Sequence, residues 1–408
     1  MKSVYIDKDE IREFWGSGIQ MTQGVSYEWE GEDVAHLHLR PLQHSFGSQQ
    51  VMYWHRADVV SNDVASGFFV KVNSAEKAEA GYVFDGIAEP CEVNYIPSKD
   101  EVFSRSKGIL EVDVLKDKRV MIVGLGSFGS QIAIELAKAG VGNFSLFDFD
   151  RVELHNLARH TCGMKDLGRL KTDAIKEAIL GKNKLARVDL FPFDINKHRE
   201  EADAEVQRAD LVICATDNNH SRFSLSESLI RHGKVTVFGR AVTRAEGGDV
   251  FRYRPGGPCY NCLVGAAAFS TAQEEVTDRS QLPAYVSQEE ADAIVQVGLS
   301  SDIEPICNLM VKLALIELAR GEKSGIEPLE DELVYDYYIW ANRRERRHAS
   351  WSPFNAAAQK PTILRWYGAR IVRDDHCPVC SAKGRLDTGD DALGFDMQGL
   401  ENVVLDTD

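Results

Sequence analysis

The sequence predicts a doubly wound, largely parallel α/β sheet, preceded by a small strand-rich domain. Two observations predict the sheet. Apolar runs alternate with helix-compatible stretches from residue 118 onwards, and the first run leads through a glycine-rich turn, GLGSFG, into an amphipathic helix. A third observation sets the N-terminal part aside, because its short runs alternate apolar and polar residues. We expect domains at residues 1–100 and 101–383, followed by an acidic, flexible tail at residues 384–408.

The first hundred residues contain at least three expected strands. These are VAHLHLRPL, VMYWHRADVV and GFFVKV, which are separated by Gly, Ser and Asn. No arrangement of catalytic residues stands out among them. We interpret this segment as an accessory or recognition domain.

The expected strands of the second domain are rich in Val, Ile, Leu and Phe, as is usual for strands buried on both faces. The first strand, RVMIVGLG, precedes a helix that closes at Gly140 and Gly142. The remaining elements complete the α/β domain. Strands are expected at residues 143–150, 187–195, 209–219, 234–242, 333–340 and 362–372, and a long helix at residues 303–320.

The composition is that of an ordinary globular protein, with 44% hydrophobic and 27% charged residues in a chain of 408. The net charge of −16 argues against a general nucleic-acid binder, since phosphate backbones are held by Lys and Arg. We find no apolar run long enough to cross a bilayer and no signal peptide in the first residues. We therefore expect a cytoplasmic protein without nucleic-acid or membrane partners.

A nucleotide-binding turn is predicted by Gly124, Gly126 and Gly129, which form GxGxxG between the first strand and its helix. The first two glycines allow a tight turn close to a ligand, and the third allows close helix–strand packing. Ser127 lies within this turn and is a further candidate contact. Asp148 ends the second strand, where a carboxylate can accept hydrogen bonds from ribose hydroxyls. These features fit NAD and ATP equally well.

The residues beyond the second strand distinguish the two nucleotides. Asn156 and Arg159 follow that strand at the carboxyl edge of the sheet, where ligands bind. Lys171 begins the next helix and Asp217 ends the fourth strand, while Arg105 precedes the first strand. Cations neutralise charge that develops on phosphates, and a carboxylate can hold Mg²⁺. The set therefore predicts phosphoryl chemistry on ATP.

From about residue 105 to residue 380 the chain resembles the ThiF/MoeB-type adenylyltransferases, the superfamily of ubiquitin-activating enzymes. The matching segments are GLGSFGS, DFDRVELHNLARH, GRLK, ATDNNHSR, PCYNC and CPVC. The resemblance implies a Rossmann-like domain, usually paired as a homodimer, that joins a carboxylate to the AMP part of ATP and releases pyrophosphate. A carboxylate is already a nucleophile, so positioning and charge neutralisation supply most of the catalysis.

The resemblance also implies roles for the candidate residues. Asp148 is expected to bind ribose, Asn156 and Arg159 to contact phosphates, and Lys171 to contact the α-phosphate. Asp217 is expected to coordinate Mg²⁺.

Other positions carry weaker expectations. Ser127, Asp150 and Asn218 are expected to line the nucleotide site, and Arg105 to reach the nucleotide of a dimer partner. The chain departs from the family pattern at His160, where Gln is common, and in the short spacing from Arg105 to the glycine turn.

Four of the eight cysteines form two CxxC pairs, Cys259 with Cys262 and Cys377 with Cys380. In a cytosolic protein such pairs more often bind a metal than form disulfides. The resembling family holds a structural zinc at these two places. We therefore expect one closed, tetrahedral zinc site with four thiolate ligands.

An acyl acceptor is harder to assign. The crossover segment, at about residues 263–302, should carry the acceptor but contains no cysteine. Cys214 and Cys307 are expected in the core, which leaves Cys162 as the single cysteine near the nucleotide. A hydroxyl acceptor is the alternative. The candidates are Ser270, Thr271, Ser280, Ser287, Ser300 and Ser301.

Four functions fit these observations to different degrees. The leading hypothesis is ATP-dependent activation of the C-terminal carboxylate of a ubiquitin-like protein, with transfer to a hydroxyl or to a conjugating-enzyme-like partner left open. The alternative keeps the chemistry but uses a short peptide in peptide-antibiotic synthesis, with the N-terminal domain as a peptide clamp. A third possibility is a non-catalytic family member that only pairs with an active partner, but such a protein would not need Arg159, Lys171 and Asp217. NAD-dependent oxidoreduction explains neither the lysine nor Asp217.

Overall fold

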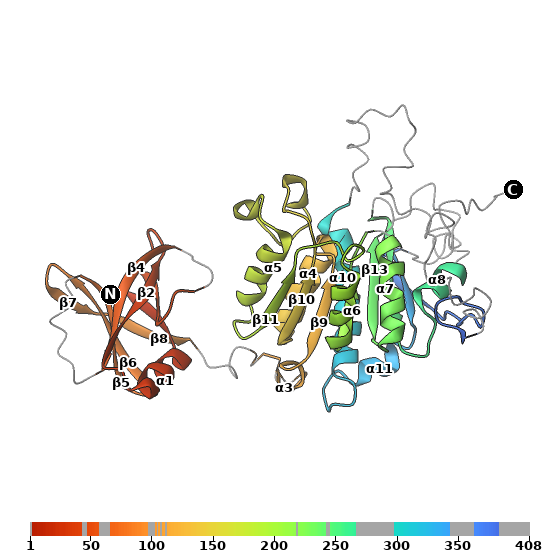
Figure 1. Ribbon diagram of the computed structural model, residues 1–408. Helices are drawn as coiled ribbons and strands as arrows, with labels where there is room; N and C mark the ends of the chain where they lie inside the picture. Colours follow the sequence, from red (N-terminus) through yellow and green to blue (C-terminus); the bar gives the residue numbers. More distant parts are fainter. Residues whose placement is uncertain are drawn as a thin grey trace. The chain divides into compact units, whose positions relative to one another are not determined.

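The computed structural model describes most of the chain and divides it into two compact units, Met1–Lys107 and Gly108–Asp408 (Figure 1). Asn218, most of the expected crossover segment and the expected acidic tail lie outside the described residues. The described residues are 2–42, 47–56, 66–96, 103, 105–106, 108–110, 112–217, 219–241, 245–266, 298–342 and 363–382.

In its described residues, the N-terminal unit forms an eight-stranded sheet and the helix α1 (Lys8–Ser17). The strand order is β7-β6-β5-β4-β2-β3-β1-β8, with parallel pairing of β1 with β3 and β8 and of β4 with β5. The strands are β1 (Ser3–Asp7), β2 (Met21–Glu28), β3 (Val34–His38), β4 (Ser48–Arg56), β5 (Gly67–Ser74), β6 (Lys77–Phe84), β7 (Ile87–Pro90) and β8 (Glu92–Ile96).

Helix α1 follows from local sequence signals. Asp7 is its N-cap, and its side chain accepts a hydrogen bond from the N–H of Asp9 at 2.9 Å. Gly18 ends the helix in the left-handed conformation, with φ +73°. Ile11 and Phe14 are buried and pack with Trp54 in the core of this unit. The helix therefore covers one face of the sheet.

The second unit contains a mixed sheet in the order β11-β10-β9-β12-β13-β14-β15-β16. Strands β11 to β13 of this order run parallel, and the later pairs are antiparallel. The strands are β9 (Arg119–Val123), β10 (Asn143–Phe147), β11 (Arg187–Phe191), β12 (Leu211–Cys214), β13 (Thr236–Ala241), β14 (Gly247–Tyr253), β15 (Tyr337–Ala341) and β16 (Arg365–Ala369). The helices are α3 (Val112–Leu115), α4 (Ser127–Ala139), α5 (Lys171–Leu180), α6 (Arg199–Arg208), α7 (Asn219–Arg231), α8 (Tyr260–Ala266), α10 (Ser300–Leu318) and α11 (Pro328–Glu332), with 3₁₀ turns η1 (Leu154–Asn156) and η2 (Met164–Asp166).

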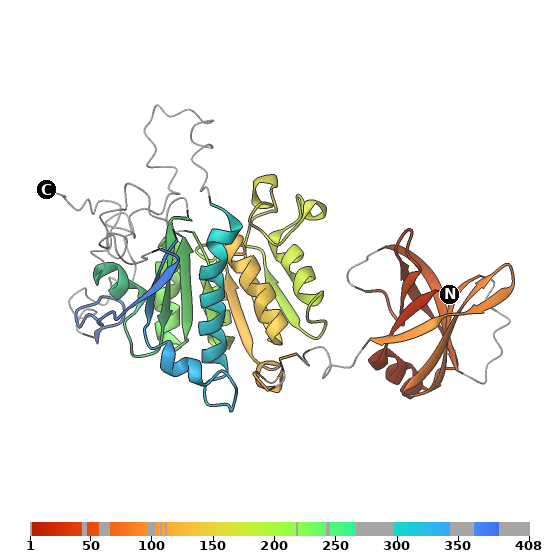
Figure 2. The ribbon, with the colours of Figure 1, turned by 180° about the vertical axis from the view of Figure 1, so that it is seen from behind.

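Helices cover both faces of this sheet. Val120 and Ile122 of β9 pack with α4, α5 and α10, whereas Met121 and Val123 pack with α6 and α7. Side chains alternate in this way because successive residues of a strand point to opposite faces. Figure 2 shows α4 and α10 in front of the sheet, and Figure 1 shows α6 and α7 in front of its other face. The predicted α/β fold is confirmed.

The strand order places a ligand-binding edge between β9 and β12. From β11 to β13 the order is third, second, first, fourth, fifth along the chain, so the connections change direction between β9 and β12. Ligands of such sheets bind at the carboxyl ends of the strands at this switch point. The glycine turn follows β9, Asp148 follows β10 and Asp217 follows β12. The topology therefore gathers the predicted residues at one edge.

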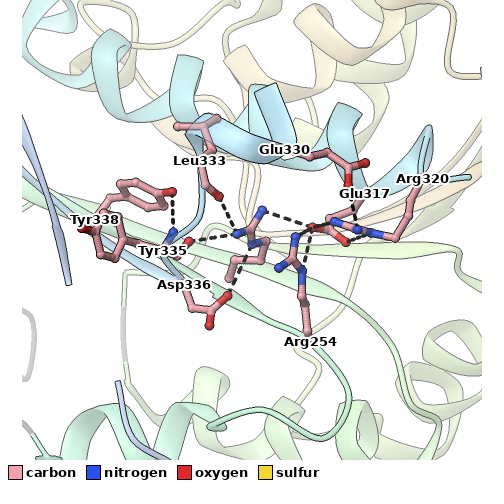
Figure 3. A network of polar contacts seen from close by, with 9 residues as sticks. Arg254, Glu317, Arg320, Glu330, Leu333, Tyr335, Asp336 and Tyr338 are labelled. Carbon is pink, nitrogen blue, oxygen red and sulfur yellow. Dashed lines mark hydrogen bonds and ion pairs between the residues drawn. The ribbon is translucent and has the colours of Figure 1, made fainter. Parts of the chain in front are cut away.

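Strand β14 was missing from the sequence prediction, and its charged side chains explain why. Arg252 of β14 is buried and contacts Glu317 of α10 at 3.2 Å, while its guanidinium also donates to the carbonyls of Leu333 and Tyr335, at 2.9 Å each. Glu317 also accepts from Arg254 and Arg320, as Figure 3 shows. Partners far along the chain thus make a polar segment stable within a sheet.

Among the described helices, none has both the length and the hydropathy needed to cross a bilayer.

Candidate nucleotide-binding site

The glycine turn has a different constraint at each glycine. Gly124 has φ +86°, and a Cβ there would lie 2.8 Å from the carbonyl oxygen of Ala215. A Cβ on Gly129 would lie 1.8 Å from the carbonyl oxygen of Gly124. Gly126, in contrast, would carry a Cβ with no atom within 4 Å, and it is the N-cap of α4. The first and third glycines therefore allow close packing, and the second leaves open space at the helix N-terminus.

Two hydrogen bonds hold Leu125, the residue between Gly124 and Gly126. Its N–H donates to Oδ2 of Asp148 at 2.6 Å. Its carbonyl lies 2.6 Å from Nε2 of His160. Because a carbonyl only accepts, Nε2 carries the proton in this contact. The turn after β9 is thus tied to the strand end of β10 and to the loop that follows it.

The second ring nitrogen of His160 shows that this side chain is neutral. The N–H of Cys162 donates to Nδ1 at 3.1 Å, so Nδ1 must be an acceptor. Burial lowers the pKa of His160 below its ordinary value, and the charge of Lys171 acts in the same direction, whereas the bond to Leu125 and the charge of Asp166 oppose it. Sequence reasoning noted His160 only as a departure from the family pattern and missed this positioning role.

Lys171 lies at the centre of the site and is surrounded by carboxylates. Its side chain is only 9% exposed, and Nζ donates to Oδ2 of Asp150 at 2.7 Å. Burial by itself would lower the pKa of Lys171, but the negative charges of Asp148, Asp150 and Asp217 outweigh it and raise the pKa. The lysine therefore stays cationic at neutral pH. Residues far apart in the sequence form one charged cluster here.

The carboxylates of this cluster differ in exposure. Burial raises the pKa of Asp148, against the opposing effects of Lys171 and of the N–H groups of Leu125 and Asp150. Asp150 and Asp217 are exposed. The site therefore has one carboxylate engaged with the backbone and two that face solvent, an arrangement that can bind a ribose and a cation.

The loop after β10 carries Arg159, the residue before His160. Asn156 organises the loop, because its Oδ1 accepts from the N–H of Glu153 at 3.0 Å and its carbonyl accepts from the N–H of Arg159 at 2.9 Å. Arg159 is partly exposed, and burial lowers its pKa. The carbonyl of Arg159 lies 3.4 Å from Nε2 of Gln131 on α4. The loop is therefore held to the helix that begins at the glycine turn.

Arg105 is exposed and belongs to the N-terminal unit. Its expected role in a partner's site stays a prediction, as does that of Asn218.

The four paired cysteines come together in the structure. Their Sγ atoms all lie within 4.8 Å of one another, with contacts of 3.7 Å between Cys259 and Cys262, 3.6 Å between Cys259 and Cys377, and 3.5 Å between Cys262 and Cys380. A disulfide needs about 2 Å between sulfurs, whereas thiolates at about 2.3 Å from a tetrahedral zinc ion lie roughly 3.8 Å apart. The separations therefore fit a metal and exclude disulfides.

The single cysteines lie in environments that disfavour a thiolate. Burial raises the pKa of Cys162 to about 12 and also raises the pKa values of Cys307, Cys214 and Cys91. A thiol must ionise to act as a nucleophile. Ser300 is the first residue of α10, and its Oγ lies 3.2 Å from Nε2 of Gln131. Ser301 is exposed, and the other four hydroxyl candidates lie outside the described residues.

A family comparison agrees with this geometry. The ThiF family matches residues 103–328. The chain belongs to the ThiF family. The expected resemblance to ThiF/MoeB-type adenylyltransferases is thereby confirmed.

Several curated proteins match the ThiF region of this chain. The molybdopterin-synthase adenylyltransferase of Escherichia coli K12 is 38% identical over 153 residues, which cover 37% of this chain and 60% of that protein. The adenylyltransferase and sulfurtransferase MOCS3 of Drosophila virilis is 35% identical over 156 residues, or 36% of this chain and 33% of that protein. The chain thus matches less than two thirds of either relative.

Solved structures of E. coli MccB are also similar. One of them, with MccA-N7isoASN, is 17% identical over 66% of this chain and 69% of that chain, with a TM-score of 0.47.

Proposed function

We propose that this chain uses ATP to adenylate the C-terminal carboxylate of a ubiquitin-like protein, with release of pyrophosphate. The observation that carries the proposal is the cluster of Lys171 with Asp148, Asp150 and Asp217, beside an open glycine turn. Membership of the ThiF family and the names of the relatives, which are adenylyltransferases, support the same chemistry.

Each residue of the cluster has a place in this reaction. The N–H groups at the start of α4 and the open face of Gly126 bind phosphate oxygens. Both oxygens of Asp148 accept a backbone N–H, Oδ1 from Asp150 at 2.8 Å and Oδ2 from Leu125 at 2.6 Å, and each carboxylate oxygen has a second lone pair that can accept from a ribose hydroxyl. Lys171 and Arg159 neutralise the α-phosphate and the departing pyrophosphate. Asp217 holds Mg²⁺, which supplies further charge neutralisation when bound.

The chemical step needs no general base. The carboxylate oxygen of the substrate attacks the α-phosphorus, and the bond between this phosphorus and the oxygen that bridges it to the β-phosphate breaks. An acyl-adenylate and pyrophosphate result. The contribution of the protein is to hold both reactants and to neutralise the phosphates. This agrees with a site whose one histidine near the glycine turn is neutral and bound to the backbone.

Three further features belong to the proposal. The four cysteines bind one Zn²⁺ as a structural ion, which the four-thiolate donor set fits. The chain works as a homodimer, in which Arg105 of one copy reaches the nucleotide of the other. After adenylation, the acyl group passes to a hydroxyl or to a conjugating-enzyme-like partner rather than to Cys162, whose buried thiol is poorly ionised.

Exchange of labelled pyrophosphate into ATP tests the proposal. We expect exchange in the presence of Mg²⁺ and a small protein of ubiquitin fold that ends in Gly. The same protein with its C-terminal carboxylate amidated is the matched control, because it keeps the fold and removes only the nucleophile. Exchange with a short peptide but not with the small protein would show that the substrate is a peptide. Nucleotide binding without exchange, across a panel of such carboxylates, would contradict an adenylating enzyme.

A further inference from the structure

Tyr260 lies between two of the paired cysteines and opens helix α8. It is 4% exposed, and its ring stacks on Phe238 with 4.9 Å between centroids. Phe223 of α7 contacts the same ring edge-on, with 5.4 Å between centroids. These contacts hold the ring against the sheet and α7, and a phenylalanine would satisfy them equally well.

The hydroxyl of Tyr260 makes a contact that a phenylalanine could not. It donates to Oδ1 of Asn219, the first residue of α7, at 2.6 Å. Nη1 of Arg222 lies 3.4 Å from both the Tyr260 hydroxyl and Oδ1 of Asn219. The guanidinium also lies 6.0 Å from the centroid of the Tyr260 ring. A buried hydroxyl costs free energy unless it is bonded, so this contact fixes the ring's orientation.

Arg222 carries the connection to the nucleotide site. It is only 1% exposed, and its Nη2 donates to the carbonyl of Thr216, the residue before Asp217. A buried guanidinium needs closely fitting partners, and here these are Thr216, Asn219 and Tyr260. The side chain of Arg222 therefore holds the turn that carries Asp217, and Arg222 is itself in contact with the hydroxyl of Tyr260.

The other end of the connection reaches the nucleotide site. Asp217 is exposed at the carboxyl edge, and its charge raises the pKa of Lys171. A continuous series of contacts thus runs from the cysteine cluster through Tyr260, Arg222 and Thr216 to the residues proposed to hold Mg²⁺ and the α-phosphate. Figure 1 shows α8 beside α7.

We propose that Tyr260 is a positioning residue that couples the four-cysteine cluster to the turn bearing Asp217, so that an intact cluster is needed for full affinity for Mg²⁺–ATP. This inference rests on the proposed function, since it assigns Asp217 to Mg²⁺. It adds that the cysteine cluster does more than cross-link the C-terminal segment.

The substitution Tyr260→Phe tests the coupling, because it removes one hydroxyl and keeps the packing. We expect the Kd for Mg²⁺–ATP, measured by calorimetry, to rise about 5- to 10-fold, as for the loss of one buried hydrogen bond. The Kd for ATP without added Mg²⁺ should not change, because the effect acts through Asp217. Zinc content and melting temperature are measured in parallel, to separate positioning from a loss of metal or of stability.

Tyr253→Phe is the matched control. Tyr253 lies in the same apolar cluster as Tyr260 and the cysteines, but on β14 and outside the series of contacts described above. We expect its Kd for Mg²⁺–ATP to equal that of the unaltered protein. An equal shift in both variants, or no shift in Tyr260→Phe, would overturn the coupling while leaving the proposed function standing. No binding of ATP by the unaltered protein would instead count against the proposed function itself.

Hydrogen exchange gives a readout that is independent of the nucleotide. In Tyr260→Phe, and after removal of the metal by a chelator, the amides of residues 215–222 should exchange faster than in the unaltered protein. Removal of the metal from Tyr260→Phe should then add little, because the connection is already broken. Additive effects of the two changes on this segment would show that the cluster and the turn are independent.

Discussion

Two charged clusters in the second unit have opposite compositions, and they serve different purposes. At the carboxyl edge, one lysine lies among the carboxylates of Asp148, Asp150 and Asp217. Where β14 and α10 end, one glutamate, Glu317, lies among Arg252, Arg254 and Arg320 (Figure 3).

The two clusters differ in how completely the protein itself balances their charges. Around Glu317, the arginines find further partners in Asp336, Glu330 and the carbonyls of the segment before β15. Around Lys171, two of the three carboxylates face solvent. A cluster balanced internally and buried stabilises the fold, whereas an exposed excess of one charge at a strand edge is available to a cation or a substrate. Substitutions in the two clusters and at His160 test this difference.

The largest effect is expected from Asp217→Ala, in the exposed cluster. Loss of this carboxylate should lower the rate of pyrophosphate exchange by about 100-fold or more, because the proposed Mg²⁺ ligand is gone. The melting temperature should stay close to that of the unaltered protein, since Asp217 is exposed. Cys162→Ala is the control and should leave exchange unchanged, as its thiol is buried and weakly acidic. Loss of exchange in Cys162→Ala would show that a single cysteine takes part.

Glu317→Ala, in the buried cluster, is expected to have a large effect on stability and none on nucleotide binding. Glu317 is 3% exposed, and its removal takes the nearest counter-charge, at 3.2 Å, from the buried Arg252. We expect the free energy of unfolding to fall by about 3–5 kcal/mol. Below the melting temperature, the Kd for ATP should be unchanged. Glu330→Ala, which removes a partly exposed partner of Arg320, should cost only about 0–1 kcal/mol.

Strong acid should also lower the contribution of the Glu317 cluster to the free energy of unfolding. Burial would raise the pKa of Glu317, but the bonds and charges of Arg320, Arg254 and Arg252 outweigh it, and the pKa is lowered. A carboxyl group with a folded-state pKa below its unfolded value stabilises above the unfolded value and loses this contribution as the pH falls through the folded value. The stability gap between the unaltered protein and Glu317→Gln should therefore close at strongly acidic pH. A gap that persists would show that the charge is not the stabilising feature.

A smaller effect is expected at His160, which links the two loops of the site. Protonation would turn Nδ1 into a donor facing the N–H of Cys162. Because burial lowers the pKa of His160, nucleotide affinity should hold at neutral pH and through the ordinary histidine pKa of about 6.5, and should weaken only at lower pH.

His160→Gln and His160→Leu separate protonation from packing. Gln supplies both a donor and an acceptor and does not titrate, so its affinity for ATP should be near that of the unaltered protein and independent of pH between about 5 and 7. Leu supplies neither and should weaken binding about 10-fold at every pH. An equal pH dependence in the Gln variant and the unaltered protein would assign the titration to another group.

Much of the site could be predicted because its signals are local. The strand, the glycine turn and the helix at residues 119–139 follow one another directly, and Gly124 and Gly129 have the tight contacts expected of this motif. The CxxC pairs were equally readable, although the two pairs are separated by 118 positions from Cys259 to Cys377. Strand β14 was missed because Arg252 and the neighbouring Arg254 are typical of a polar loop, and their partner Glu317 lies 65 and 63 residues further along the chain.

Other roles could not be predicted because the partner lies elsewhere in the chain. His160 binds a carbonyl 35 residues before it, and Tyr260 binds an amide 41 residues before it. Neither contact leaves a periodicity or a spacing rule in the sequence. The buried positions of the single cysteines were also inferred only in part, since exposure depends on what packs against each thiol.

The alternation of strands and helices from β9 to β13, the glycine turn and the two cysteine pairs were determined by the sequence itself, because each depends on neighbouring residues or on a short motif. Only the tertiary structure decided that Lys171 meets three carboxylates, that His160 is neutral, and that Tyr260 reaches the turn before α7. The physical reason is that parallel strands bring their carboxyl ends to one edge of the sheet. Charges and hydrogen bonds at this edge join residues that are far apart in the sequence, so the sequence alone does not show that they meet.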